Sequence, residues 1–199
     1  MKPTFRVGVE EEFFIVDAES GRALSTMPPA FWAAALRSAP NVSKELLQSQ
    51  IELQTEPCLS ADALRGQLFE GRAALALAAR EHGIALMAAG THPTMDWREA
   101  IRSSGPRYSK LVRDMRVLAQ RNMFCGLHVH VEAPDPDSRV RLICRCVPFL
   151  PLFLALSVSS PFWCGEWTGM CGYRLTGYDE LPRTGLPPLV AGVAPTAVQ

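Results

Sequence analysis

Three segments of the chain alternate apolar and polar residues with the period of two that half-buried β-strands show. They span residues 4–16, 50–56 and 126–132. In each segment one face is apolar and the opposite face carries ionisable or amide side chains. The pattern therefore predicts three strands with chemically rich polar faces. Those faces carry Glu10, Glu12, Gln50, Glu52, Gln54, Glu56, His128, His130 and Glu132.

Helical spacing of apolar residues fills the regions between these strands. Ser60 is a suitable N-cap and Gly83 a suitable C-terminal glycine for a helix between them. A short buried strand is predicted over 84–89, and an amphipathic helix over 108–118. Residues 137–157 predict another helix, buried in its apolar part and kinked at Pro151.

The order of these elements favours one α+β domain. Strands and helices are mixed, and the polar strand faces leave only the opposite face of the sheet for helices. We therefore expect an antiparallel sheet with helices on one face, in preference to a doubly wound parallel sheet. The length of 199 residues fits one large domain.

Composition and charge exclude several functional classes. Lys plus Arg and Asp plus Glu are both 20, so no global field attracts nucleic acid or an anionic membrane. The most apolar stretch, 147–158, is shorter than the roughly 20 residues that a membrane span needs. The six cysteines form no CxxC pair, which favours a reducing cytoplasm.

Glu10, Glu12, Glu52 and His128 on one sheet face indicate a cation site. Crowded carboxylates raise one another's pKa and are costly to bury without compensation. Oxygen-rich groups suit Mg²⁺ or Mn²⁺, and Mg²⁺ usually binds together with substrate phosphates. Alternation alone leaves open the alternative that these residues simply face water.

Two further patterns leave alternatives open. The pair His128 and His130 is also typical of zinc hydrolases, although such a site needs more ligands than the sequence offers. No glycine-rich phosphate loop is present. Arg174 and Arg183 are candidates for clamping a phosphate or carboxylate, because a guanidinium holds either group through two parallel hydrogen bonds.

Several short motifs in the same order resemble the YbdK-type carboxylate-amine ligases, also called glutamate-cysteine ligase type 2. The resemblance covers nearly the whole chain up to Pro188. The matching segments are Gly8–Glu12, Glu45–Leu53, Gly90–Pro93, Gly126–Val131, Ala155–Ser157, Ser160–Trp163, Tyr173–Arg174 and Leu181–Pro187.

The resemblance implies an ATP-dependent ligase that forms an amide through an acyl phosphate, with weak glutamate-cysteine ligase activity. Glutamate and cysteine are candidate substrates, and the implied fold is an incomplete glutamine-synthetase-like catalytic sheet. The implied metal ligands are Glu10, Glu12, Glu45, Glu52 and His128. The implied catalytic residues are Glu52 and Arg174, and the implied nucleotide contacts are His130, Arg174 and Arg183.

The members of this family are nearly twice as long. Residues 1–188 are therefore expected to form the N-terminal portion of one ligase domain, and 189–199 an unrelated or disordered tail. The alternative function is a non-catalytic half-site that needs a partner chain. Exposed sheet edges and apolar surface would then favour a homo-oligomer or a complementing chain.

Overall fold

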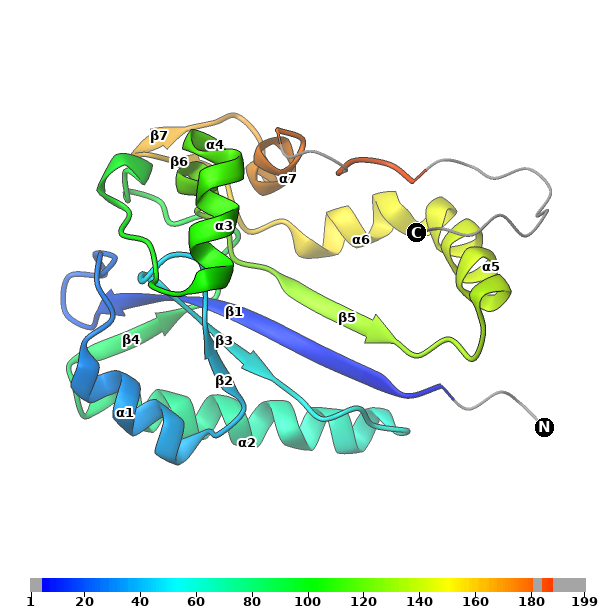
Figure 1. Cartoon of the computed structure of the whole chain (residues 1–199), viewed down its shortest axis with the longest axis horizontal. Helices are drawn as coiled ribbons and strands as arrows, with labels where there is room; N and C mark the ends of the chain where they lie inside the picture. Colours follow the sequence, from blue (N-terminus) through cyan, green and yellow to red (C-terminus); the bar gives the residue numbers. More distant parts are fainter. Residues whose placement is uncertain (1–4, 181–183, 188–199) are drawn as a thin grey trace.

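A curved antiparallel sheet built around one long strand organises the molecule (Figure 1), whose computed structural model describes residues 5–180 and 184–187. Strand β1 (Val7–Asp17) pairs on one side with β3 (Gln50–Gln54), and β3 pairs with β2 (Val42–Lys44). On its other side, β1 pairs first with β5 (Leu127–Val131) and then with β4 (Ile84–Met87). All these pairs are antiparallel, as the sequence predicts.

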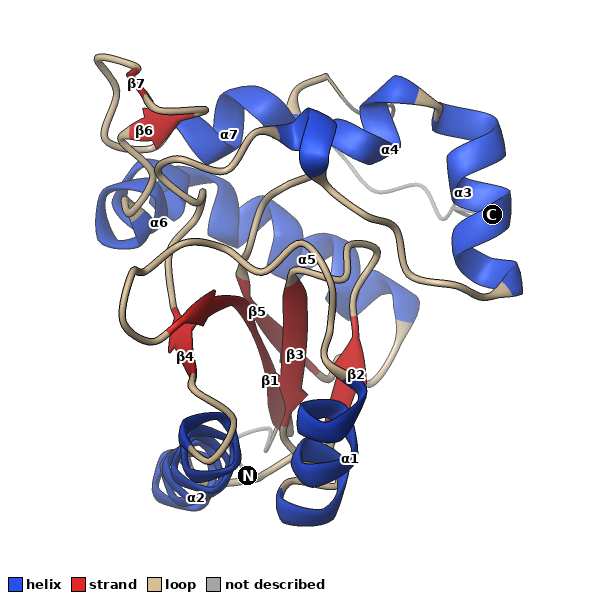
Figure 2. Cartoon of the chain, turned by 90° about the vertical axis from the view of Figure 1, so that its left-hand side faces the viewer, coloured by secondary structure: helices blue, strands red, loops and turns tan. Residues whose placement is uncertain are grey.

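Two helices, α1 (Pro29–Ser38) and α2 (Ala61–Arg80), cover one side of the sheet (Figures 1 and 2). The predicted N-cap is confirmed, because the Ser60 hydroxyl accepts a hydrogen bond of 3.2 Å from the Ala63 amide. The core between helices and sheet buries the apolar faces that alternation predicts. Its larger members are Phe13, Ile15, Phe31, Ile51, Leu53 and Leu75.

Shorter elements lie on the opposite side of the sheet (Figure 2). They cover a second buried cluster at one end of that face, which includes Phe14, Leu47 and Met123. The other end of the same face keeps the polar residues. The elements on this side include η1 (Trp97–Glu99), α3 (Pro106–Met115), α4 (Val117–Arg121), β6 (Phe162–Trp163), β7 (Glu166–Trp167) and α7 (Tyr173–Tyr178), and the cluster packs against residues of η1, α3, α4 and β6.

The apolar run after β5 differs from its prediction. It forms α5 (Pro136–Cys146), η2 (Val147–Phe149) and α6 (Leu150–Ser157), and none of these residues is buried. The expectation of a buried helix is therefore wrong. The helix is broken at the 3₁₀ turn η2 and not at Pro151. Pro151 instead occupies the first turn of α6, where a missing N–H breaks no helical hydrogen bond.

The combined helical run Pro136–Ser157 is longer than 147–158, the most apolar stretch of the sequence. Its 22 residues are, by length and composition, sufficient to cross a membrane. None of these residues is buried, so the apolar side chains of the run remain at least partly exposed to solvent.

One carboxylate of β1 points toward the helices instead of the polar face. Glu11 is only 5% exposed, and its carboxylate pairs with the Arg72 guanidinium on α2, at 2.6 Å through Nε. The pair joins helix to sheet. Removing the cation leaves a buried charge without a partner, which costs more than losing an exposed ion pair.

We predict that Arg72→Leu lowers the free energy of unfolding by about 2 kcal/mol at pH 7. Urea unfolding followed by circular dichroism measures the change. Lys110→Leu breaks the exposed pair with Asp114 and serves as the control, with no measurable destabilisation expected. Equal effects of the two substitutions would contradict the structural role of the Glu11 pair.

Candidate active site

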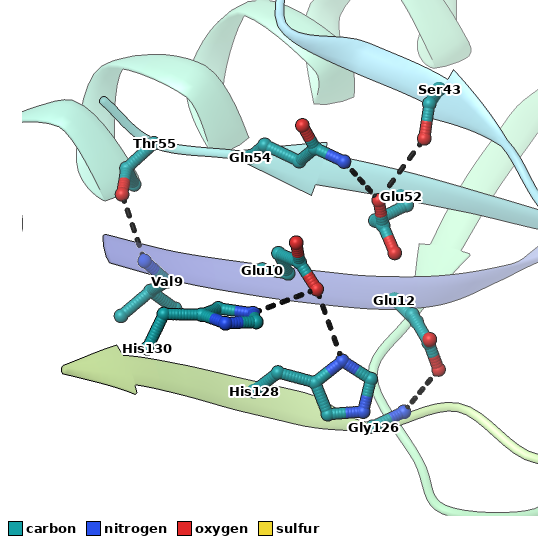
Figure 3. Close-up of polar contacts among 10 residues, drawn as sticks. All are labelled: Val9, Glu10, Glu12, Ser43, Glu52, Gln54, Thr55, Gly126, His128 and His130. Atoms are coloured by element: carbon teal, nitrogen blue, oxygen red, sulfur yellow. Dashed lines mark hydrogen bonds and ion pairs between the residues drawn. The ribbon is translucent and has the colours of Figure 1, made fainter. Parts of the chain in front are cut away.

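The polar faces of β1, β3 and β5 meet in one patch (Figure 3). Strand register places Glu12 opposite Glu52, and Glu10 opposite His128. Because neighbouring strands hold opposed side chains on the same face, these residues lie side by side although they are far apart in sequence. The sequence-predicted face is therefore assembled as expected.

Three carboxylates form the centre of this patch. One oxygen each from Glu12, Glu45 and Glu52 lies within 4.8 Å of the others. Glu52 is 7% exposed and accepts hydrogen bonds from the Ser43 hydroxyl, at 3.1 Å, and from the Gln54 amide (Figure 3). The backbone N–H of Gly126 donates to Glu12 at 2.6 Å. These three donors orient the cluster, and none of them carries a positive charge.

Burial and mutual repulsion change how this acid cluster ionises. Burial, together with the neighbouring carboxylates of Glu12 and Glu52, raises the pKa of Glu45 to about 7. Burial also raises the pKa of Glu12, although the nearby His128 and Arg174 counteract part of that effect. Near neutral pH the cluster therefore favours either a retained proton or a bound cation.

Glu10 forms a second group with the two histidines of β5. Its carboxylate lies 3.2 Å from Nδ1 of His128 and 3.1 Å from Nε2 of His130. Burial opposes ionisation of Glu10, but the hydrogen bonds from both imidazoles outweigh burial and lower its pKa. The histidines therefore converge on a carboxylate next to the acid cluster (Figure 3).

Arg174 supplies the positive charge at the edge of the patch. Its backbone N–H donates to the Ser160 hydroxyl at 3.0 Å, and its guanidinium lies 4.5 Å from the centre of the Tyr178 ring. Its Nε is buried and has no hydrogen-bond partner in the described part of the chain. An anionic ligand beside the acid cluster would satisfy this donor.

Two glycines let this arginine approach the sheet. A Cβ at Gly126 would overlap Nη2 of Arg174 and lie 3.0 Å from Nε2 of His128. A Cβ at Gly90 would lie 3.2 Å from Cδ of Arg174 and 3.1 Å from Cβ of Ser160. The glycines of two motifs are thus explained by close packing around one side chain.

The remaining residues of the Gly90–Pro93 motif brace the same region. The imidazole of His92, which is 2% exposed, accepts the N–H groups of Thr94 and Met95 at Nδ1, at 3.2 and 3.1 Å. Nε2 therefore carries the proton and donates to the Gly21 carbonyl at 3.1 Å. Burial lowers the pKa of His92, so this histidine is a neutral structural residue.

A hollow of about 510 Å³ lies beside the carboxylates. Its wall includes Trp32 and Lys44, whose ammonium lies 4.9 Å from the centre of the Trp32 ring. Tyr108 closes another part of the wall by donating its hydroxyl to the Lys44 carbonyl at 2.5 Å. The acid cluster therefore adjoins a space that a small molecule can enter.

Sequence reasoning locates most of this site but not all of it. The structure brings Glu10, Glu12, Glu45, Glu52, His128, His130 and Arg174 to one region, whereas Arg183 lies outside the described residues. Ser43 and Lys44 were not predicted, because the three-residue strand β2 is too short to show a period. Gln50 belongs to the same predicted polar strand face as Glu52. Its side-chain amide donates a hydrogen bond to the Phe124 carbonyl at 2.7 Å.

The fold is similar to the folds of two solved proteins. A bifunctional glutathione synthetase from Pasteurella multocida matches with a TM-score of 0.59 and 16% identity, over 80% of this chain and 24% of that one. The glutamate–cysteine ligase from Francisella tularensis, solved in complex with AMP, matches with a TM-score of 0.52 and 14% identity, over 72% and 30%. At sequence identities this low, the similarity shows a shared fold alone.

The chain belongs to glutamate-cysteine ligase family 2, whose family model matches residues 6–196. A relative from Bradyrhizobium sp. (strain ORS 278) is 43% identical over 93% of this chain and 46% of its own length. A relative from Jannaschia sp. (strain CCS1) is 44% identical over 94% of this chain and 50% of its own. Both carry the provisional name glutamate–cysteine ligase 2, and the chain spans about half of their length.

The raised pKa of Glu45 predicts a pH-dependent stability. The folded pKa of about 7 lies above the ordinary value of 4.5, so between these values the folded chain holds more protons than the unfolded chain. The free energy of unfolding should therefore fall by about 2 kcal/mol from pH 4.5 to 7, after allowance for partial solvent screening.

The measurement compares wild type with Glu45→Gln in urea unfolding from pH 5 to 8, with a chelator present. Wild type should lose stability relative to the variant as the pH rises. Millimolar Mn²⁺ should reduce the loss, because a cation favours the ionised cluster. A pH-independent difference would contradict the assignment of the raised pKa.

Proposed function

We propose that this chain supplies the metal- and phosphate-binding face of an ATP-dependent carboxylate-amine ligase. The observation that carries the proposal is the trio Glu12, Glu45 and Glu52, whose oxygens converge beside an open hollow. Family membership supports the reaction class. The AMP-bound ligase of similar fold supports the use of an adenine nucleotide.

The proposed reaction has two steps. A substrate carboxylate oxygen attacks the γ-phosphorus of ATP, which forms an acyl phosphate and releases ADP. An amine then attacks the acyl carbon, loses a proton and expels inorganic phosphate, so that an amide bond is formed. Glutamate and cysteine are the candidate substrates, because the relatives carry the name of a glutamate–cysteine ligase. The proposed location is the cytoplasm, where ATP is abundant.

The residues present fit Mg²⁺ or Mn²⁺. Carboxylate oxygens are the ligands that these ions prefer, and three carboxylates crowded within 4.8 Å carry negative charge that a divalent cation would offset. We assign Glu12, Glu45 and Glu52 as the carboxylates that hold the metal, with Glu10 and His128 beside them. A bound divalent ion would neutralise the charge on the phosphates.

The chain's own cations and hydrogen bonds orient the other groups. The unpartnered Nε of Arg174 is available to a phosphate or carboxylate oxygen. His130 is 62% exposed and contacts Glu10, so it is placed to meet a ligand that enters over β5. Gln54 and Ser43 hold Glu52 in one orientation, which limits reorganisation when a ligand binds.

A second candidate function is a half-site without turnover. The chain spans about half the length of its relatives, which favours a chain that binds nucleotide but needs further residues to react. Saturable Mg-ATP binding without release of ADP would support this candidate over a complete ligase.

We predict that Glu52→Gln weakens Mn²⁺ binding at least about tenfold, which corresponds to 1.4 kcal/mol. The amide removes a negative charge but preserves the shape of the buried side chain. Calorimetric titration at pH 8 measures the affinity, and ADP release that depends on a carboxylate and an amine should fall in parallel. Glu70→Gln on the exposed surface of α2 is the control. Unchanged Mn²⁺ affinity in Glu52→Gln would exclude the metal assignment.

Gly126→Ala should weaken Mg-ATP binding about tenfold while changing the free energy of unfolding by less than about 1 kcal/mol. The added methyl group meets the mobile end of Arg174 and displaces its guanidinium from the patch. Gly66→Ala, which has nothing within 4 Å of its added Cβ, is the matched control and should leave affinity unchanged. Full affinity in Gly126→Ala would argue against a role of Arg174 in holding the phosphates.

A further inference from the structure

Gln50 is a buried polar side chain at the start of β3 that the proposed chemistry does not use. It is 2% exposed and lies on the same strand face as Glu52. Its side-chain nitrogen lies 2.7 Å from the Phe124 carbonyl oxygen and 3.3 Å from Sγ of Cys125. An amide nitrogen carries two protons, so both contacts can be made at once. Gln50 therefore connects the start of β3 to the segment that leads into β5.

This connection joins two strands that do not pair with each other within the described residues. Strands β3 and β5 pair with opposite edges of β1. Each of the three strands carries a residue of the proposed metal site, namely Glu12 on β1, Glu52 on β3 and His128 on β5. Because the backbone ladders attach β3 and β5 only to β1, a change in sheet twist changes the separation of these side chains. A direct link from β3 to the approach of β5 limits that freedom.

The segment that Gln50 holds contacts the acid cluster directly. Gly126 follows the two residues to which Gln50 is bonded, and its N–H donates to the Glu12 carboxylate at 2.6 Å. The Gly126 carbonyl in turn accepts the Glu12 N–H at 3.0 Å. The hydrogen bonds of Gln50 therefore fix the backbone donor that orients Glu12.

Phe124 also supports the helix that carries Arg174. Its ring stacks on Trp163 with 5.3 Å between the ring centres, and lies 5.7 Å from the centre of the Tyr178 ring. A Cβ at Gly177 would overlap the Phe124 ring, so α7 packs closely against it. The buried amide on β3 thus holds a residue that supports the arginine as well as the carboxylates.

We propose that Gln50 is a positioning residue that sets the spacing of the carboxylates and makes the site selective for a small divalent ion. This role rests on the proposed metal site. Mg²⁺ requires near-ideal octahedral geometry with oxygen ligands at about 2.0–2.1 Å, whereas Ca²⁺ accepts irregular shells at about 2.3–2.6 Å. A cluster held at one spacing favours the smaller ion, whereas a cluster that can spread no longer excludes the larger one. Residues that orient metal ligands typically contribute about 10- to 100-fold to metal affinity.

A glutamine that only stabilised the fold would act differently. Its loss would leave the buried Phe124 carbonyl without this donor and lower the free energy of unfolding, but it would not discriminate between two ions of equal charge. Gln67 on α2 offers a matched comparison on the helical side of the sheet. Its amide also donates to a cysteine sulfur, that of Cys58 at 2.9 Å, and its oxygen accepts the Glu56 N–H at 2.8 Å.

The test is calorimetric titration of the 199-residue chain with Mg²⁺ alone and with Ca²⁺ alone at pH 8. Methionine is similar to glutamine in length but donates no hydrogen bond. Gln50→Met should weaken Mg²⁺ binding at least about tenfold and Ca²⁺ binding less than about threefold. Gln67→Met is the control and should leave both affinities unchanged. Gln50→Asn, whose amide is too short to reach Phe124, should lose selectivity as Gln50→Met does, and urea unfolding confirms that each variant remains folded.

Hydrogen exchange provides a readout that requires no metal ion. The Gly126 amide, which the Glu12 carboxylate protects, should exchange at least about tenfold faster in Gln50→Met than in wild type. Its rate should be unchanged in Gln67→Met. If the wild-type chain binds neither ion, the proposed metal site is wrong, and the exchange rate alone decides whether Gln50 positions Gly126.

Two outcomes would overturn the positioning role. An equal loss of Mg²⁺ and Ca²⁺ affinity in folded Gln50→Met would show that Gln50 does not set the size of the bound ion. Wild-type affinities combined with wild-type exchange at Gly126 would show that the segment before β5 keeps its place without this side chain.

Discussion

The crowding of carboxylates on one face of a β-sheet is the constraint on which the remaining structure depends. Glu12 and Glu52 are opposed by strand register, and the adjoining Glu45 brings a third negative charge. Such an arrangement is unfavourable for an isolated fold, because like charges repel and burial removes their hydration. The fold offsets this cost locally with hydrogen bonds from Gly126, Ser43 and Gln54.

Segments far apart in the chain are held together around the same charges. The Gly90 carbonyl accepts the Cys125 N–H at 3.1 Å, and the Ser159 carbonyl accepts the Gly90 N–H at 3.2 Å. The next residue, Ser160, accepts the N–H of Arg174. The strand that carries the histidines and the helix that carries the arginine are thus fixed to a common loop. This loop places one guanidinium close to the acid cluster, where its charge offsets part of the rise that burial causes in the pKa of Glu12.

The site is supported on one side and open on the other. Beneath β1 and β3, two helices bury the apolar face and bind the sheet through the Glu11–Arg72 pair. Beyond β5, both the strand edge and the apolar helix α6 face solvent. The helical layer therefore holds β1 and β3, whereas β5 has support along only one of its edges in the described chain.

Local patterns determined much of what the sequence revealed. Alternation identified the strands around Glu10, Glu52 and His128, and capping residues delimited α2, because both signals arise from neighbouring residues. The resemblance of ordered motifs indicated the ligase family, which the family model confirms over residues 6–196. Alternation could not distinguish a metal-binding face from a solvated one.

Only the tertiary structure decided how these faces meet. Strand register set Glu12 against Glu52, and long-range packing brought Arg174 to Gly126, neither of which follows from local spacing. The exposure of α6 also escaped prediction, because an apolar helix has the same sequence pattern whether its cover comes from its own chain or from other residues. Sequence determines which faces are apolar or charged, but only the arrangement of the elements determines what those faces contact.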